Sequence, residues 1–363
     1  MNQKERAAFA GQRAKQGQTN PRGIAILLLI FMLALFASAC GNSTDKSTNV
    51  TGTPGNNKPE QTNSPQPTTK ADEPQMQTVK HEYGETKVPL HPKRVAVVGL
   101  EDIMLSLEAP LVYAYGFDGY YLEEQLREAK ITLSGSADIK PNLEAILAAQ
   151  PDLIVVQKYF VDQGGYDELS KVAPTLAYAP DDWKSTIVSI GKALGIEEQA
   201  QEVIENYHDK LKEAKETIVQ AVGSDKTVAF IRPSDKDLQV FFPSFNFVYR
   251  DLGLKPDASI AEFQKVAPDD WGIDTSLEKL PSITADYVFA IYGGSISTSE
   301  EWAMETAAST EVEKLQVWKA MPAVKQNHVF KVSSRHWMSS GPIAEGREID
   351  DVVAAVTGKK QLP

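Results

Sequence analysis

A short internal repeat constrains the fold of this chain more than any other feature. One block reads Asn-Leu-Glu-Ala-Ile from Asn142, and a second reads Ser-Leu-Glu-Lys-Leu from Ser276. In each block an aspartate, Asp152 or Asp286, follows the glutamate by eight residues and directly precedes an apolar run. Asn and Ser are favoured at helix N-termini, so each block predicts a short helix that leads into a buried strand. Two copies of one helix–strand unit predict two lobes of similar architecture.

Short apolar runs alternate with helical patterns along most of the chain. This alternation predicts α/β lobes with mostly parallel central sheets. The strands expected in the first lobe are Arg94–Val98, Leu111–Tyr115, Asp152–Gln157 and Thr175–Tyr178. Those expected in the second lobe are Thr227–Ile231, Leu238–Phe242, Tyr287–Tyr292 and Val329–Val332.

A long helical stretch separates the two sets of strands. A helix is expected over Trp183–Leu194, ended by Gly195, and a second one over Glu197–Ala221. The second helix has an apolar stripe at three- and four-residue steps and would be about 37 Å long at 1.5 Å per residue. A coiled-coil arm is one interpretation, but a stiff connector packed against both lobes fits the stripe better. The sequence therefore predicts lobes over residues 77–182 and 223–363, a connector over 183–222, and a ligand cleft between the lobes.

The N-terminus has the pattern of an export signal that ends at Cys40. Basic residues precede an apolar run over Ile24–Phe36, and Ala37, Ser38 and Ala39 come directly before Cys40, the only cysteine. Thirteen apolar residues are too few for a helix across a bilayer core of roughly 30 Å, but they suit a signal peptide. The small residues resemble a bacterial lipobox, with Ala37 where Leu is commoner, which implies a signal peptide over residues 1–39 and lipidation of Cys40. The alternatives are an ordinary signal peptide or an uncleaved anchor.

The segment after Cys40 predicts a tether, and the overall charge argues against one class of partner. Residues 40–76 are polar and rich in Asn, Thr, Pro and Gly, so we expect a disordered tether. The net charge is −12, and the first 39 residues carry five basic groups and one acidic group, so the remainder carries −16. That charge, without a basic stripe, argues against nucleic acid as a partner.

A series of motifs along residues 77–360 is similar to one known family. The motifs begin at His81, Pro92, Asn142, Pro151 and Leu169, and they continue in a tail that runs from Trp318 through Gly341 to Ala344. In order and spacing they resemble the substrate-binding lipoproteins of ABC importers for iron–siderophores, in the class with a rigid interlobe helix.

This resemblance implies a function and a location. The chain would be a monomeric receptor, not an enzyme, anchored through Cys40 on the extracytoplasmic face of a bacterial cell membrane. It would bind a ferric siderophore and deliver it to an ABC permease dimer. Glu144 and Glu278, one in each repeat block, would dock onto arginines of that permease, although a carboxylate in the first turn of a helix is otherwise explained by the helix dipole. No cofactor is expected, because the iron travels inside the siderophore.

The ligand site is expected between the lobes, beyond the carboxyl ends of the strands. A siderophore saturates the coordination of Fe³⁺, so arginine would meet its anionic oxygens and aromatic rings its apolar periphery. Few cationic groups are expected in the cleft, which favours a hydroxamate or citrate-hydroxamate complex over a trianionic catecholate. Ten side chains are candidates: Tyr115, Phe117, Lys158, Tyr159, Trp183, Arg232, Phe245, Tyr292, Arg335 and Trp337.

Other functions stay open at this point. Haem, cobalamin or ferric citrate could replace the siderophore, with Tyr159 as an axial ligand in the case of haem. An anchored extracellular hydrolase is a remote alternative, because no nucleophile–base motif is evident in the sequence. The five histidines are widely spaced, and none forms a metal-binding motif, so direct metal ligation is not expected.

Overall fold

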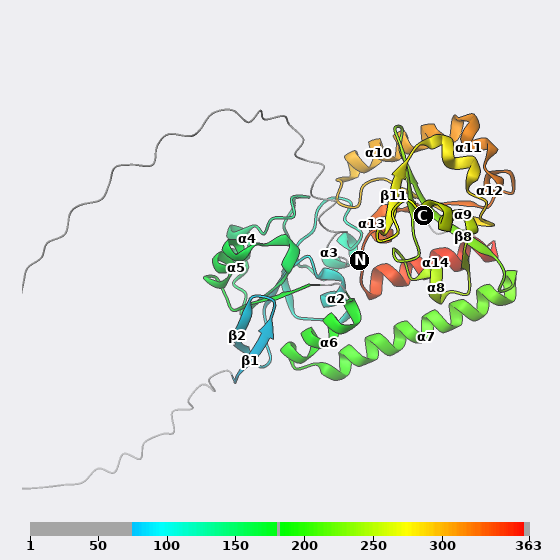
Figure 1. The fold of residues 1–363 in the computed structure, drawn as a ribbon. Coiled ribbons are helices and arrows are strands. Elements are labelled where there is room, and N and C mark those ends of the chain that lie inside the picture. Colours follow the sequence, from blue (N-terminus) through cyan, green and yellow to red (C-terminus); the bar gives the residue numbers. More distant parts are fainter. Residues whose placement is uncertain (1–74, 180–181, 359–363) are drawn as a thin grey trace, which may run out of the picture. The chain divides into compact units, whose positions relative to one another are not determined.

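Two α/β lobes follow one another along the chain, joined by a pair of helices (Figure 1). The computed structural model describes residues 75–179 and 182–358, which all belong to one unit. The predicted signal peptide, Cys40 and nearly all of the predicted tether lie outside these residues. None of the helices that are described is both long and apolar enough to cross a membrane.

The N-terminal lobe is built on a parallel sheet with the strand order β5-β4-β3-β6-β7. An antiparallel hairpin precedes this sheet, formed by β1 (Met76–His81) and β2 (Gly84–Pro89). The sheet strands are β3 (Val95–Val98), β4 (Leu111–Ala114), β5 (Thr132–Leu133), β6 (Leu153–Gln157) and β7 (Thr175–Tyr178). The helices are α2 (Glu101–Ser106), α3 (Glu123–Glu128), α4 (Leu143–Ala149), η1 (Lys158–Phe160) and α5 (Gln163–Ser170).

The connector consists of α6 (Trp183–Leu194) and α7 (Glu197–Val222). Gly195 ends α6 with a φ of 71°, a left-handed conformation that suits glycine. The sequence predicted both helices, and the observed end of α7 lies one residue beyond the predicted one. The apolar stripe of α7 is buried at Ala200, Tyr207, Ala214 and Ile218, so the helix is packed over its length instead of projecting as an arm.

The C-terminal lobe has a mixed sheet with the order β11-β9-β8-β12-β13, and β10 also pairs with β8. Its strands are β8 (Thr227–Pro233), β9 (Leu238–Phe241), β10 (Lys255–Pro256), β11 (Gly272–Thr275), β12 (Tyr287–Tyr292) and β13 (Val329–Ser333). Its helices are α8 (Val248–Asp251), α9 (Ala258–Gln264), η2 (Leu277–Ser282), α10 (Ser299–Glu311), η3 (Val312–Lys314), α11 (Gln316–Ala320), α12 (Pro322–Lys325), α13 (Ser334–Trp337) and α14 (Pro342–Thr357).

The structure confirms two mostly parallel α/β lobes joined by a long helix. Every strand expected from the sequence is present, and its ends differ from the prediction by at most two residues. Strand β9 runs antiparallel to β8 and β11, and the hairpin and the strands β5, β10 and β11 were not predicted. These strands are short or lie at an edge, where the apolar signal in the sequence is weak.

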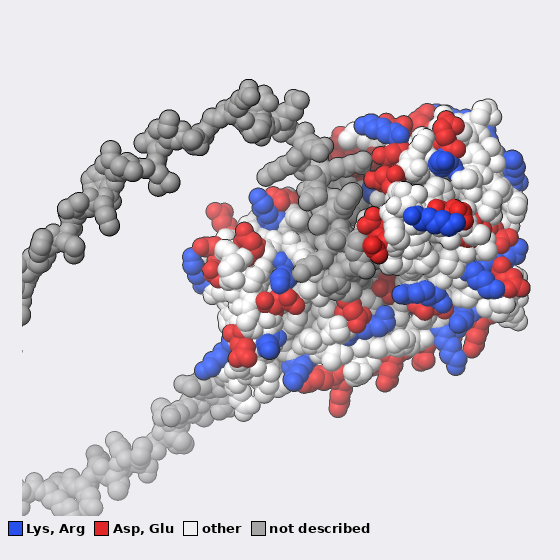
Figure 2. Space-filling view, in the orientation of Figure 1, with Lys and Arg blue, Asp and Glu red and all other residues white. Residues whose placement is uncertain are grey.

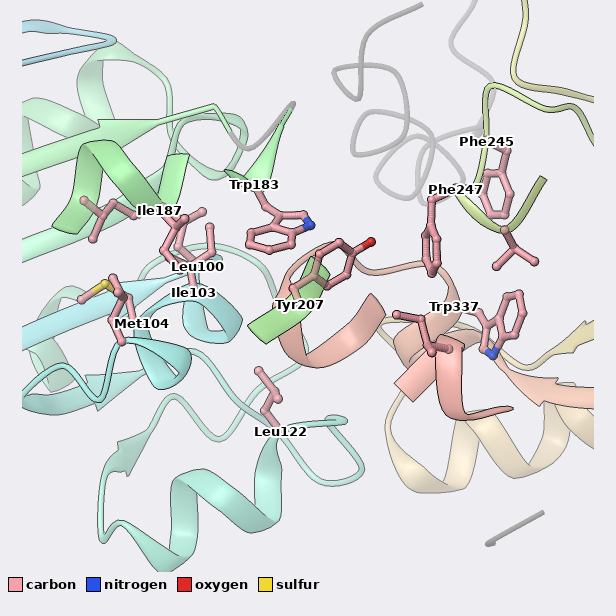
Figure 3. Close-up of a cluster of buried hydrophobic side chains, with 14 of the residues drawn as sticks. Leu100, Ile103, Met104, Leu122, Trp183, Ile187, Tyr207, Phe245, Phe247 and Trp337 are labelled. Carbon is pink, nitrogen blue, oxygen red and sulfur yellow. The ribbon is translucent and has the colours of Figure 1, made fainter. Parts of the chain in front are cut away.

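One buried apolar cluster runs through the lobes and the connector (Figure 3). Leu100 and Ile103 enter it from the N-terminal lobe, Tyr207 from α7, and Phe247 and Trp337 from the C-terminal lobe. Removing apolar surface from water stabilises a fold in proportion to the area buried. The shared cluster therefore holds the two lobes and the connector together as one packed body.

The internal repeat forms the same contact between two central strands in both lobes. Asp152 accepts hydrogen bonds from the amides of Lys93 (2.7 Å) and Arg94 (2.9 Å), where the chain enters β3. Asp286 accepts a hydrogen bond from the amide of Thr227 (2.9 Å), where the chain enters β8. The two aspartates thus tie β6 to β3 and β12 to β8 at matching positions.

The helices of the two blocks differ in kind. The side chain of Asn142 accepts from the amide of Ala145 and begins the α-helix α4. The side chain of Ser276 accepts from the amide of Glu278, but η2 is a 3₁₀-helix with Pro281 inside it. Proline lacks an amide hydrogen and disfavours a regular α-helix, which explains the difference.

Candidate functional site

A cavity of about 730 Å³ is lined by residues of both lobes. Its walls come from the chain just beyond the carboxyl ends of the central strands. Gly99, Tyr115 and Gln157 supply the ends of β3, β4 and β6. Arg232 and Gly293 supply the ends of β8 and β12. This is the position that ligands take in open α/β sheets, as the sequence predicted.

Buried carboxylates form part of the N-terminal wall. Glu101 accepts hydrogen bonds through Oε1 from the amides of Gly99 (2.8 Å) and Tyr115 (3.1 Å). Its Oε2 accepts one from the hydroxyl of Tyr120 (3.3 Å). Burial raises the pKa of Glu101 to about 7, although these hydrogen bonds act in the opposite direction.

The neighbouring carboxylate joins the two lobes. Asp102 accepts hydrogen bonds from the amides of Ile343 (2.9 Å) and Ala344 (2.8 Å) at the start of α14, and from the hydroxyl of Tyr121 (2.9 Å). Gly341 lies so close that a Cβ atom there would overlap the Asp102 side chain, and its φ of 153° also favours glycine. Burial raises the pKa of Asp102 to about 6.

The C-terminal wall is made of polar loops. The turn between β8 and β9 contributes Ser234–Asp237, and the loop after β12 contributes Gly293–Ser297. Ser234 Oγ donates to Asp237 Oδ1 (2.5 Å), and Ser297 Oγ donates to Glu305 Oε2 (2.9 Å). Asp274 from β11 and Glu305 from α10 also line the cavity.

Four of the ten predicted ligand residues line the cavity. These residues are Tyr115, Tyr159, Arg232 and Phe245. Tyr115 is anchored through its hydroxyl, which donates to the carbonyl of Ala137 (3.0 Å). Arg232 donates through Nη2 to the carbonyl of Gly293 (2.8 Å), which joins the two loops of the C-terminal wall.

Two predicted tryptophans belong to the apolar core and not to the cavity lining. Trp337 is 1% exposed, stacks on Phe289 and donates through Nε1 to Asp351 (2.8 Å). Trp183 is 2% exposed and meets the ring of Tyr207 edge-on, with the ring centroids 5.0 Å apart. Figure 3 shows Trp183 and Trp337 within the shared cluster.

Three more predicted residues have structural contacts away from the cavity. Lys158 forms an ion pair with Glu82 (2.8 Å). Tyr292 donates to Glu313 (2.8 Å) and packs in the second core of the C-terminal lobe. Phe117 is buried in an apolar cluster of the N-terminal lobe.

Arg335 lies at a contact between the lobes. Its guanidinium carbon is 4.9 Å from the centre of the Trp302 ring, and a Cβ atom at Gly119 of the N-terminal lobe would overlap the guanidinium. Its Nε and Nη2 are buried, and no hydrogen-bond partner for them is found among the residues that the structure describes. Burial lowers the pKa of Arg335, and the charges of Asp118 and Glu123 act against that effect. The structure therefore places it beside the cleft and not in the lining.

The sequence reasoning missed the two buried carboxylates. Glu101 and Asp102 come three and four residues after the last residue of β3. The candidates at the other strands were chosen from the residues that follow each strand end, and the same choice at β3 would have found these two. Trp271 was also missed, because no predicted strand precedes it. It stacks with Phe245, and both rings line the cavity.

Glu144 and Glu278 are both exposed, each in the first turn of its helix. Asp and Glu side chains are interspersed with Lys and Arg over the described face in Figure 2. Among the described residues, no group of three or more His, Cys, Asp or Glu side chains is placed to hold a metal ion.

Comparison with known proteins decides the family. A model of the periplasmic binding protein family matches residues 104–335, which is more than half of the chain. The chain belongs to this family. Its members bind solutes and are not enzymes as a class.

Similar proteins support the assignment over nearly the full length. An iron(3+)-hydroxamate-binding protein of Bacillus subtilis, FhuD, is 28% identical over 92% of this chain and 97% of its own. A solved periplasmic binding protein component of a ferrichrome ABC transporter from Bacillus subtilis is 28% identical, with a TM-score of 0.63 over 77% of this chain and 99% of its own. SirA of Staphylococcus aureus, solved with staphyloferrin B, is 26% identical, with a TM-score of 0.61 over 77% of this chain and 98% of its own.

Proposed function

We propose that this protein is an extracytoplasmic receptor that binds a ferric siderophore between its lobes and delivers it to an ABC importer. The observation that carries the proposal is the cavity of about 730 Å³ that both lobes line. This volume falls within the range of about 300–1,000 Å³ that is usual for small-molecule sites. Relatives named for iron–hydroxamate binding favour a hydroxamate among siderophores.

The cavity offers contacts for the periphery of such a complex. Tyr115, Tyr159, Phe245 and Trp271 present aromatic surface, and Arg232 presents a guanidinium group. Because a siderophore supplies all the iron ligands itself, the protein need only recognise its outer atoms. We propose these five residues as ligand contacts.

A titration of tryptophan fluorescence tests the cargo. Trp271 lines the cavity, so a bound ferric complex should quench its emission. We expect a ferric hydroxamate to bind more tightly than a ferric catecholate, ferric citrate, haemin or cobalamin. Binding of haemin or cobalamin alone would overturn the siderophore proposal. The Trp271→Phe variant, which keeps an aromatic ring at the contact, should show less quenching than wild type while an equilibrium dialysis measurement still detects binding.

Delivery would use the two exposed glutamates and the lipid anchor. Glu144 and Glu278 occupy matching positions in the two lobes, which suits contact with the two halves of a permease dimer. Lipidation of Cys40 would keep the receptor at the membrane surface. Mass spectrometry of the mature N-terminus tests the lipidation, and a mature chain without acyl groups on Cys40 would refute it.

Charge reversal tests the docking. The double variant Glu144→Lys with Glu278→Lys should abolish uptake of the ferric complex in cells while leaving its Kd within about twofold, because both residues lie outside the cavity lining. A matched control is Glu205→Lys with Glu213→Lys, two exposed glutamates on α7. Uptake that survives in the first variant, or fails equally in the control, would refute the docking assignment.

A further inference from the structure

The loop between β12 and α10 reaches from the C-terminal lobe to the N-terminal lobe. It comprises residues 293–298, and all but the last of them line the cavity. The side chain of Ile296 packs against the buried apolar cluster of the N-terminal lobe that contains Tyr115. Directly after the loop, the amide of Ser299 donates a hydrogen bond to the carbonyl of Asp118 (3.1 Å). A segment of the C-terminal lobe is therefore attached to the N-terminal lobe at two points beside the cavity.

The attachment at Ser299 is closely packed. Gly119 has a φ of 87°, and a Cβ atom there would overlap the Ser299 hydroxyl and the guanidinium of Arg335. The two residues that follow Gly119, Tyr120 and Tyr121, line the cavity. The N-terminal and C-terminal walls therefore meet here, at the edge of the cavity.

The loop begins with two glycines at the end of the central strand β12. Gly293 has a φ of 78°, and a Cβ atom there would overlap the indole of Trp302. A Cβ atom at Gly294 would overlap the side chains of Ser297 and Glu305. Glycine thus suits the observed packing, and two in succession can also absorb a large change of backbone angles. That is the property that the hinge of a moving loop requires.

The loop is held to the N-terminal lobe less firmly than the joint at Asp102. At that joint, one buried carboxylate accepts hydrogen bonds from two α14 amides and from the hydroxyl of Tyr121. Among the described residues, the attachment of the loop consists of the partly buried side chain of Ile296 and the hydrogen bond of Ser299. Segments with few buried contacts open locally while the rest of a fold stays intact. The loop can therefore detach while the joint holds the lobes together.

We propose that the 293–298 loop is a lid, which swings about Gly293 and Gly294 to admit the ferric complex and closes again over it. The inference rests on the proposed function and adds the step that controls exchange of the ligand at the same site. Only receptors with an open lid exchange ligand, so the attachments of the lid slow entry and exit alike. Weakening an attachment outside the cavity lining should therefore change both rates and leave Kd nearly constant.

The Ser299→Pro variant removes the donor of the hydrogen bond between the lobes. Ser299 is the first residue of α10, where proline is favoured, and it does not line the cavity. Thr298 has a ψ of 166°, which suits a residue before proline. In stopped-flow measurements with ferrioxamine B, a ferric trihydroxamate, association and dissociation should each become about three- to tenfold faster, while Kd stays within about twofold.

A matched control places the same substitution at another helix. Ala258 is the first residue of α9 in the C-terminal lobe and does not line the cavity, so Ala258→Pro should leave both rates unchanged. Unchanged rates in Ser299→Pro, or an equal change in the control, would overturn the lid. Faster dissociation without faster association would also overturn it, because the contact would then stabilise only the loaded receptor.

Hydrogen exchange tests the lid without any ligand. In the full-length protein, the Ile296→Ala variant removes most of the apolar contact with the N-terminal lobe. Amides of residues 293–299 should then exchange at least about threefold faster than in wild type, while those of β12 keep their rates. Equal exchange in the two proteins would overturn the lid. Failure of every ferric complex to bind would overturn the proposed function, and the exchange rates would then decide by themselves whether the loop opens.

Discussion

The two walls of the cleft use carboxylates in opposite ways. In the N-terminal wall, Glu101 and Asp102 are buried, and main-chain amides and tyrosine hydroxyls donate to them. In the C-terminal wall, Asp235 in a turn, Asp274 in β11 and Glu305 in α10 are exposed. A buried, hydrogen-bonded carboxylate stabilises one arrangement of the chain, whereas an exposed carboxylate keeps contact with water and contributes little to stability. The difference indicates that the carboxylates of the N-terminal wall contribute more to stability than those of the C-terminal wall.

The largest effect is expected at the joint between the lobes. The Asp102→Ala variant should lower the free energy of unfolding by about 3 kcal/mol, because two α14 amides and the Tyr121 hydroxyl lose a buried acceptor. Urea unfolding at pH 7.5 measures this. Asp102→Asn retains one acceptor oxygen and should cost less, so equal losses in the two variants would contradict the hydrogen-bond explanation.

A pH-dependent effect is expected at Glu101. Its pKa is raised from 4.5 to about 7, so its protonated form contributes stability that is complete below about pH 4.5 and lost as the pH rises through 7. Glu101→Gln mimics the protonated form. Relative to wild type, its unfolding free energy should therefore increase by about 2–3 kcal/mol between pH 4.5 and pH 8. Urea titrations at both pH values test this, and a constant difference would show that Glu101 does not titrate in this range.

A much smaller stability effect is expected in the C-terminal wall. The Asp235→Asn and Glu305→Gln variants should change the unfolding free energy by less than about 0.5 kcal/mol each, as is usual for exposed side chains. A loss above 2 kcal/mol in either would break the contrast between the walls, because it would show that carboxylates of the C-terminal wall also stabilise the fold.

The smallest effect concerns closure of the cleft. The lobes share an apolar cluster, and Asp102 bonds to the start of α14, so we expect ligand binding to change the radius of gyration by less than about 1 Å. Small-angle scattering with and without a saturating ferric hydroxamate measures the change. A contraction of several ångströms would show that the joint at Asp102 opens in the free protein.

Local patterns in the sequence predicted the elements well and the site only in part. Apolar runs located β6 and β12, and the stripe of α7 located the connector, because burial imposes a periodicity that the chain itself displays. The strand-end rule also led to Tyr115 and Arg232. The rule failed for Trp337, because a tryptophan after a strand can either contact a ligand or pack in the core. The neighbouring residues do not distinguish these two roles.

The sequence by itself determined two α/β lobes, the connector between them and the repeated block that leads into β6 and β12, because all of these depend on patterns near in sequence or repeated along it. The tertiary structure decided which groups face the cavity. Asp237, Asp274 and Glu305 are far apart along the chain and converge only when β8, β11 and α10 pack. The same packing places Arg335 against Gly119 and Trp337 in the core. Convergence of distant side chains depends on how the elements pack, which no local pattern encodes.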